Sequence, residues 1–239
     1  MHDQTSPRLG ALIPERPMAD AFADSDDYDL ALDSSAFEIR SLFPTPLIRA
    51  PLRQPRAFND ALERLILDRA AQEPSVSLSN AGGWQSGDDF TGWSGACGAQ
   101  LIDLIRRLAD SATGMQTADG FVGGGPAWKI HAWANVNRAG DANSLHHHPG
   151  AFWSGVYWVS MDESAGGGEL EVSDPRGVMP TLYAPQLSFG LPGCLSAGGS
   201  DFITPSPGVM LLFPAWLQHA VRPHASRQPR ISVAFNLCV

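Results

Sequence analysis

Residues 127–137 read AWKIHAWANVN, and this stretch decides the fold class because two kinds of side chain alternate along it. One face is small or branched and apolar, with Ile130, Ala132, Ala134 and Val136. The other face is polar or aromatic, with Lys129, His131, Trp133, Asn135 and Asn137. A two-residue period is typical of a β-strand that separates two environments. We therefore predict a strand with one apolar face and one mixed polar face.

Four later stretches have the composition of short strands, with Gly, Pro and Asp between them. They are SGVYWVS (154–160), GGELEVS (167–173), GVMLLFP (208–214) and RISVAFNLCV (230–239). Earlier in the chain, apolar residues recur at three- and four-residue spacing over about 56–71 and about 97–113, which predicts two helices. This order predicts a mainly β fold with flanking α-helices, namely a cupin-like double-stranded β-helix or jelly roll.

The charge of the chain is unevenly distributed. The 239 residues carry a formal net charge of −9, and residues 1–35 hold eight Asp and Glu side chains against two Arg side chains. We predict that residues 1–36 form a disordered acidic leader and that residues 37–239 form a single domain. This acidic balance excludes nucleic-acid binding through a basic surface. No apolar run is long enough to span a membrane, so we expect no membrane partner.

The three cysteines, Cys97, Cys194 and Cys238, are odd in number and widely spaced. They form neither a disulfide framework nor a zinc motif, and they suit a reducing, cytoplasmic compartment. Exposed strand edges are compatible with a homodimer.

Histidines gather at two places, LHHHPG with His146, His147 and His148, and LQHAV with His219. On an extended chain, residues i and i+2 point the same way and residue i+1 points to the opposite face. His146 and His148 can therefore share one metal, while His147 cannot easily join them. His219, after the strand at 208–214, can complete a facial set of three nitrogens. A facial set with open positions suits oxygen-activating, non-haem Fe(II).

Arg230 and Ser232 stand eleven and thirteen residues after His219, at the start of the last predicted strand. Their i, i+2 spacing places them on one face. A guanidinium fork beside a hydroxyl is a good receptor for a carboxylate. If His219 binds the metal, we expect Arg230 to lie about one small dicarboxylate's length away.

These motifs together resemble the Fe(II)/2-oxoglutarate-dependent oxygenase superfamily. Its signature is a His-x-acid pair, a distal His, and an Arg followed two residues later by Ser. More narrowly, the chain resembles the putative 2-oxoglutarate-Fe(II) oxygenase family of bacteria and phages, which carries H-x-HP…SGVYY and FPSWL-x-H blocks. The resemblance covers about residues 40–239. The matching segments here are WANVNRAGD, HHHPGAFWSGVYWVS, DPRG, LLFPAWLQHAV and RISVAFN.

The resemblance implies that His146, His148 and His219 hold Fe(II), and that Arg230 and Ser232 anchor 2-oxoglutarate. A C–H bond of an unknown substrate would then be oxidised with release of succinate and CO2. Three further residues are candidates for cosubstrate contact. Asn135 and Asn137 could donate to the cosubstrate or orient a ligand, and Tyr157 could reach its carboxylate or pack as a core aromatic.

The departure from the wider superfamily is His148, which replaces the usual carboxylate. Asp141, Asp162 or Asp174 could supply a carboxylate instead, but none has the i, i+2 relation to His146.

Two rival functions remain open at this point. One is a three-histidine cupin-type dioxygenase that binds its substrate directly on iron and has no use for Arg230. The other is a non-catalytic metal-binding jelly roll.

The glycine-rich stretch 177–208 shows no strand pattern, and we expect it to face the substrate.

Overall fold

The computed structural model describes residues 36, 38, 42–76, 78–178, 182–187, 189 and 198–239. The predicted acidic leader lies outside these residues except for Ala36. Part of the stretch 177–208, expected to face the substrate, also lies outside them, and its described part contains a short strand at Ser200–Ile203. The elements below all belong to one compact unit, Thr45–Ser188 with Leu195–Val239. No helix in the described part of the chain is both long and apolar enough to cross a membrane.

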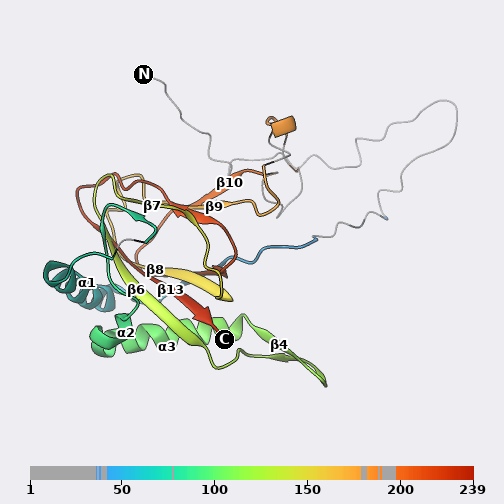
Figure 1. The fold of residues 1–239 in the computed structure, drawn as a ribbon, viewed down its shortest axis with the longest axis horizontal. Coiled ribbons are helices and arrows are strands. Elements are labelled where there is room, and N and C mark those ends of the chain that lie inside the picture. The colour runs from blue at the N-terminus through green and yellow to red at the C-terminus, as the bar shows by residue number, and fades with distance from the viewer. Residues whose placement is uncertain are drawn as a thin grey trace. The chain divides into compact units, whose positions relative to one another are not determined.

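Two antiparallel sheets form the body of this unit, with helices on one side (Figure 1). The larger sheet has the order β1-β11-β8-β13-β6-β3. Its strands are β1 (Ile48–Pro51), β3 (Trp84–Gln85), β6 (Lys129–Asn137), β8 (Trp153–Ser160), β11 (Val209–Pro214) and β13 (Arg230–Cys238). The smaller sheet has the order β10-β9-β12-β7-β2. Its strands are β2 (Asn80–Ala81), β7 (Ala142–His146), β9 (Leu170–Ser173), β10 (Ser200–Ile203) and β12 (His219–Val221).

The helices are α1 (Arg56–Gln72), the short α2 (Phe90–Trp93) and α3 (Gly95–Ser111), and a separate hairpin is formed by β4 (Gly114–Thr117) and β5 (Gly120–Gly123). α1 and α3 lie close to the ranges expected from the apolar spacing. Leu62 and Ile66 of α1 and Leu101 and Ile105 of α3 are fully buried, as their recurrence on one stripe of each helix requires.

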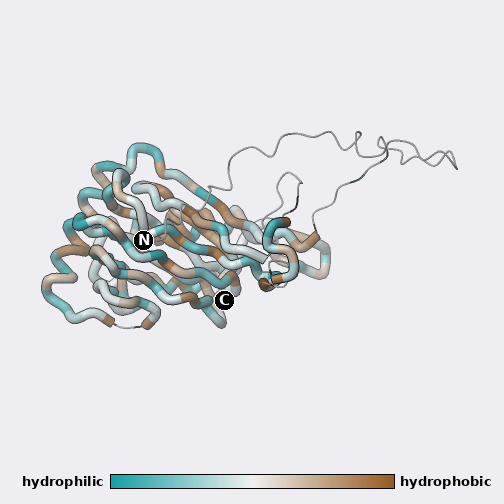
Figure 2. Tube along the Cα trace, turned by 90° about the horizontal axis from the view of Figure 1, so that it is seen from above, coloured by the Kyte–Doolittle hydropathy of each residue, from teal (hydrophilic) through white to brown (hydrophobic). Residues whose placement is uncertain are grey.

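The main core lies between the helices and the outer face of the larger sheet. Ala132, Ala134 and Val136 of β6 join Leu62, Ile66 and Leu101 in one buried cluster. A second cluster, which includes Val156, Leu170 and Leu211, fills part of the space between the two sheets. Hydrophobic and hydrophilic residues are interspersed along the trace of the chain (Figure 2). Both faces of the larger sheet are therefore covered, one by helices and one by the smaller sheet.

The register of β13 decides where the site lies. Arg230 pairs with Asn137, Ser232 with Asn135 and Ala234 with Trp133. The mixed polar face of β6 thus lies beside the Arg230 face of β13, and both face the smaller sheet. The two facing sheets and their helical cover confirm the predicted double-stranded β-helix.

Candidate metal centre

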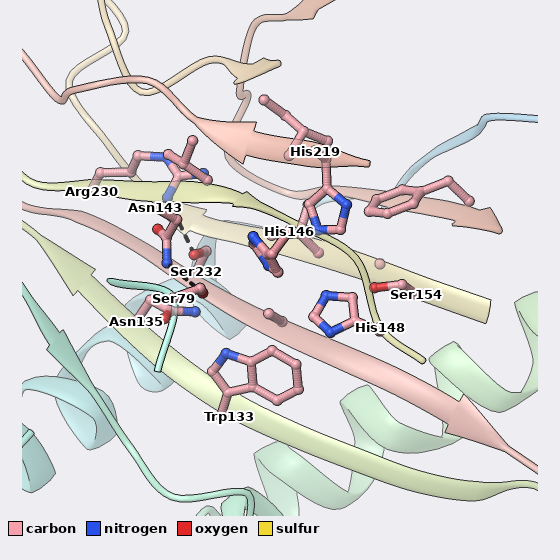
Figure 3. Close-up of a pocket in the computed structure, with 16 residues that line it drawn as sticks. Ser79, Trp133, Asn135, Asn143, His146, His148, Ser154, His219, Arg230 and Ser232 are labelled. Carbon is pink, nitrogen blue, oxygen red and sulfur yellow. Dashed lines mark hydrogen bonds between the residues drawn. The ribbon is translucent and has the colours of Figure 1, made fainter. Parts of the chain in front are cut away.

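Three histidines from two chain segments meet between the sheets (Figure 3). His146, His148 and His219 each offer a ring nitrogen, and these atoms all lie within 4.8 Å of one another. The ring centroids are 4.9 Å apart for His146 and His148, 4.5 Å for His146 and His219, and 5.2 Å for His148 and His219. Imidazole nitrogens at such spacing can share one divalent metal ion.

Local backbone pairing brings the three residues together. His219, the first residue of β12, pairs directly with His146, the last residue of β7. His148 lies two residues beyond β7, and its backbone N–H donates to the carbonyl of Ala215 at 2.9 Å. That bond ties the His148 segment to the segment leading into His219. His147 between them is exposed, as the alternation of an extended chain requires.

Backbone carbonyls orient two of the imidazoles. Nδ1 of His146 donates to the carbonyl of Ser144 at 2.7 Å, and Nδ1 of His219 donates to the carbonyl of Leu217 at 2.8 Å. With Nδ1 protonated and bonded, the lone pair of each neutral ring is on Nε2, where a metal can take it. The ring of His148 lies 5.9 Å from that of Trp133, centroid to centroid.

Burial keeps these imidazoles neutral. It lowers the pKa of His148 to about 3 and that of His219 to about 4, and it also lowers the pKa of His146. Only neutral imidazole offers a lone pair to a metal, so at neutral pH all three rings are ready to bind without first losing a proton.

Arg230 occupies the deep end of the same pocket. Its side chain is 2% exposed, and its best contacts are two long ones of 3.4 Å, from Nη1 to Asn137 Oδ1 and to Ser232 Oγ. Its Nε has no hydrogen-bond partner in the part of the chain that the structure describes. Burial lowers the pKa of Arg230 to about 10, so the guanidinium stays charged at neutral pH.

No ion pair joins Arg230 to any carboxylate in the described part of the chain. The carboxylate of Glu169 raises the pKa of Arg230 from beyond ion-pair distance. A buried cation without a direct ion pair is costly, and a bound carboxylate would relieve that cost. The pocket therefore fits an anion that lies against Arg230 and reaches toward the histidines.

The other expected cosubstrate contacts divide into two groups. Asn135 lines the pocket, and Asn137 lies behind it against Arg230; both are buried. Tyr157 does not line the pocket, and its predicted cosubstrate contact is wrong. It points from β8 to the helical side, where it packs in the main core and donates to Asn59 Oδ1 at 2.5 Å.

Tyr157→Phe is expected to destabilise the fold without affecting the metal centre. It removes the donor to the buried Asn59 oxygen, which costs about 1–3 kcal/mol in the free energy of unfolding. Urea denaturation measures this loss. The metal content and the binding of 2-oxoglutarate should both be unchanged. Tyr183→Phe, at a tyrosine that is 79% exposed, is the matched control and should be silent. A Tyr157→Phe protein that folds normally yet loses the cosubstrate would contradict this placement.

The alternative carboxylates lie outside the cluster. The carboxylate of Asp141 accepts a hydrogen bond from the backbone N–H of Arg138. The carboxylate of Asp162 accepts hydrogen bonds from the hydroxyls of Ser164 and Ser226. Asp174 forms an ion pair with Arg176. Among the described residues, the three histidines form the only group of metal-ligating side chains that meets.

Among the lining residues that the sequence interpretation did not assign to the site, four carry a polar group in the side chain, namely Ser79, Trp133, Asn143 and Ser154. Trp133 could have been found because it shares a face of β6 with Asn135. Ser79 could not, because it lies in a loop that reaches the pocket only through the pairing of β2 with β7. The amide of Asn143 donates to Ser79 Oγ at 3.3 Å, which holds this loop against the pocket.

Comparison with known proteins agrees with this geometry. Residues 131–236 match the family described as "Putative 2OG-Fe(II) oxygenase". A search of curated proteins finds no relative that matches.

Solved structures with a similar fold include a prolyl-4-hydroxylase of Pseudomonas putida, with a TM-score of 0.55, 16% identity, and coverage of 80% of this chain and 91% of that one. Another is a prolyl hydroxylase of Trichoplax adhaerens in complex with a peptide fragment of the hypoxia inducible factor oxygen degradation domain. Its TM-score is 0.53 at 13% identity, and the match covers 80% of this chain and 83% of that one. At this identity the similarity shows the fold.

Proposed function

Through residues 131–236 the chain belongs to the family of 2OG-Fe(II) oxygenases, and we propose that His146, His148 and His219 hold its iron while Arg230 and Ser232 hold its 2-oxoglutarate. The protein is thus a 2-oxoglutarate-dependent non-haem iron dioxygenase. Its substrate contributes a C–H bond, and the products on the cosubstrate side are succinate and CO2.

One observation carries this assignment of residues. The pocket that holds the three histidines ends in a fully buried guanidinium that makes no ion pair with the described residues and on which Glu169 acts only from beyond ion-pair distance. A dicarboxylate satisfies both ends of such a pocket, because one carboxylate meets Arg230 and the other end reaches the metal. A three-histidine dioxygenase without a cosubstrate, or a structural metal site, leaves the buried guanidinium of Arg230 without a direct ion pair.

The residues of the chain have distinct tasks. When bound, iron and 2-oxoglutarate together supply the electrons that activate dioxygen for C–H oxidation. The histidines fix the position of the metal, and the carbonyls of Ser144 and Leu217 orient two of the rings. Arg230 and Ser232 hold the distal carboxylate, and Asn135 borders the space between that carboxylate and the metal. The walls of both sheets exclude water from the deep end.

His148 changes the charge of the centre. Three neutral imidazoles leave the metal with its full charge of two, whereas the carboxylate common in the wider superfamily would cancel one unit. A dianionic cosubstrate then brings the centre to neutrality, which favours its binding.

The direct test is turnover of 2-oxoglutarate. Protein loaded with Fe(II) under anaerobic conditions should, on mixing with oxygen, convert 2-oxoglutarate to succinate with matching oxygen uptake. The rate can be slow when no prime substrate is present. A protein that binds iron but consumes no 2-oxoglutarate, and shows no calorimetric binding of it, would favour the three-histidine dioxygenase or the non-catalytic site.

Gly168→Ala is expected to weaken 2-oxoglutarate binding by displacing Arg230. Gly168 has a φ of +74°, and a Cβ there would lie 2.9 Å from Arg230 Cδ and 3.3 Å from its Nε. The strained backbone costs about 1–2 kcal/mol, and the guanidinium must move. Gly166→Ala, where a Cβ meets nothing within 4 Å, is the matched control. Calorimetry with 2-oxoglutarate on both variants checks the result; equal affinities would show that Arg230 tolerates the added methyl group.

We also propose a cytoplasmic location. Cys97 and Cys238 are free thiols, which suits a reducing compartment.

A further inference from the structure

Two buried nitrogen atoms border the same small space beside Gly168. They are Nε of Arg230 and Nδ1 of His224, and each of these side chains is 2% exposed. A Cβ built on Gly168 would lie 3.3 Å from Arg230 Nε and 3.4 Å from His224 Nδ1. Neither nitrogen has a hydrogen-bond partner within the described part of the chain. Buried polar groups of native proteins are nearly always paired, directly or through ordered water, so this pair of atoms calls for an explanation.

The two nitrogens have complementary roles in a hydrogen bond. Nε2 of His224 lies 2.7 Å from the backbone carbonyl of Gln228, which can only accept, so Nε2 carries a proton. A second proton on this ring would place another buried cation beside the guanidinium, which is costly. The lone pair of the ring is therefore on Nδ1, which faces the space beside Gly168. Nε of Arg230 is a donor, so a donor and an acceptor border one space.

Backbone hydrogen bonds fix the position of the His224 ring. The N–H of His224 donates to the carbonyl of Asp141 at 2.9 Å, and its carbonyl accepts from the N–H of Gly140 at 2.8 Å. The N–H of Gly168 donates to the carbonyl of the preceding residue, Pro223, at 3.2 Å. These bonds tie the segment that follows β12 to two neighbouring segments. The ring is thus a rigid support at the deep end of the pocket.

Glu169 does not provide the acceptor for Nε. Its carboxylate acts on Arg230 only from beyond ion-pair distance, and its Oε1 accepts the backbone N–H of Gly167 at 3.2 Å. Among the described residues, His224 Nδ1 is the unpaired side-chain acceptor that the structure places beside Nε.

Building on the proposed function, we propose that His224 is a positioning residue for the cosubstrate anchor: its Nδ1 receives the hydrogen of Arg230 Nε through one buried water beside Gly168. The two nitrogens make no direct hydrogen bond, and polar groups separated by more than about 3.5 Å commonly meet through a water. His224 acts only through the guanidinium, because its ring does not line the pocket that holds the histidine cluster.

This contact decides which edge of the guanidinium meets the cosubstrate. The planar group has five N–H donors in a fixed fork. Nη1 lies 3.4 Å from Ser232 Oγ, on the pocket side of Arg230 (Figure 3). With Nε held by His224, the two Nη groups remain for the parallel pair of bonds that a carboxylate prefers. His224 thereby directs the fork toward the space between Arg230 and the metal centre.

Two substitutions separate the roles of the two ring nitrogens. The side-chain oxygen of Asn takes the place of Nδ1, because both atoms are bonded to Cγ, whereas the amide nitrogen of Gln reaches the place of Nε2. His224→Asn therefore keeps the acceptor for Arg230, and His224→Gln keeps the donor to Gln228. On Mn(II)-loaded protein without oxygen, calorimetry should find 2-oxoglutarate binding weakened about tenfold in His224→Gln and within about threefold of wild type in His224→Asn.

A background that lacks Nε tests whether His224 acts through Arg230. Arg230→Lys has a carbon atom in place of Nε, so adding His224→Gln to it should change the affinity for 2-oxoglutarate by no more than about twofold. Independent sites would add their effects, whereas residues joined by one contact do not. His131→Gln, at a histidine of the same sheet that does not line the pocket, is the matched control and should bind 2-oxoglutarate like the wild type.

Nuclear magnetic resonance gives a readout that needs neither metal nor cosubstrate. A buried, hydrogen-bonded Nε–H exchanges slowly with water, so proton–nitrogen correlation spectra should show an arginine Nε–H signal that is missing from Arg230→Lys. The signal should persist in His224→Asn and disappear or shift in His224→Gln. Melting temperatures report whether each variant folds.

Three outcomes would overturn the role of His224 while leaving the cosubstrate assignment intact. In the first, His224→Gln binds 2-oxoglutarate like the wild type, or better than His224→Asn, which would give the role to the bond with Gln228. In the second, His224→Gln weakens binding equally with and without Nε. In the third, the Nε–H signal is the same in His224→Gln and wild type. Wild-type protein that binds no 2-oxoglutarate would instead contradict the proposed function, and the Nε–H signal would still report on the contact with His224.

Discussion

Arg230→Ala is expected to weaken 2-oxoglutarate binding about 30- to 1000-fold while the metal content stays unchanged. The substitution removes a charge-assisted contact to the distal carboxylate, worth roughly 2–4 kcal/mol. The guanidinium is fully buried, so water does not replace it easily. Arg230 offers no ligand to the metal, so iron should still bind. Calorimetry with 2-oxoglutarate and metal analysis of the same samples measure the two quantities separately.

Three companion variants sharpen this result. Arg230→Lys should restore part of the affinity, because an ammonium supplies the charge without the planar fork. Ser232→Ala should weaken the binding free energy of 2-oxoglutarate by about 1 kcal/mol, because it removes one hydrogen bond from a hydroxyl group. Arg222→Ala, at an exposed arginine that pairs with Glu171, is the matched control and should be silent. If Arg230→Ala bound 2-oxoglutarate as tightly as the wild type, the anchor assignment would be lost.

His219→Ala is expected to abolish stoichiometric metal binding. Loss of an outer-shell partner of a metal ligand already costs roughly 10- to 100-fold in affinity, and loss of a ligand itself costs more. His146→Ala and His148→Ala should behave alike, because their nitrogens belong to the same cluster. The expected wild-type content is about one Fe(II) per chain after anaerobic loading, measured by metal analysis.

His147→Ala provides the internal control for this series. His147 lies between two of the ligands but is exposed, so its removal should leave the metal content near that of the wild type. The comparison depends only on the direction of neighbouring side chains on an extended chain. A silent His148→Ala together with a damaging His147→Ala would show that the chain runs in the opposite register at this point.

Strict alternation made the site predictable where the two faces of a strand differ. On β6 the apolar face and the polar face carry different residues, so the pattern alone placed Asn135 and Asn137 on the side opposite Ala134 and Val136. The structure confirms this division. The same reasoning separated His147 from its two neighbours, and the spacing from His219 to Arg230 predicted that both would serve one pocket.

The alternation of β8 is less informative. Seven of its eight residues, Trp153–Val159, are buried, because helices cover one face and the smaller sheet covers the other. The sequence pattern of such a strand does not say which face points inward. Tyr157 was therefore assigned to the pocket as one alternative, and only the packing against α1 and the bond to Asn59 place it on the helical side.

The sequence by itself determined the chemistry: the three imidazoles, the buried arginine and the two-residue period that orients them. The tertiary structure decided which segments close the pocket and which end of it stays open. Ser79 reaches the site through the pairing of β2 with β7, and Asn135 meets Ser232 because β6 pairs with β13. Such contacts join residues far apart in the chain. Local periodicity carries no information about them, since it describes only the direction of a side chain and not the partner that it meets.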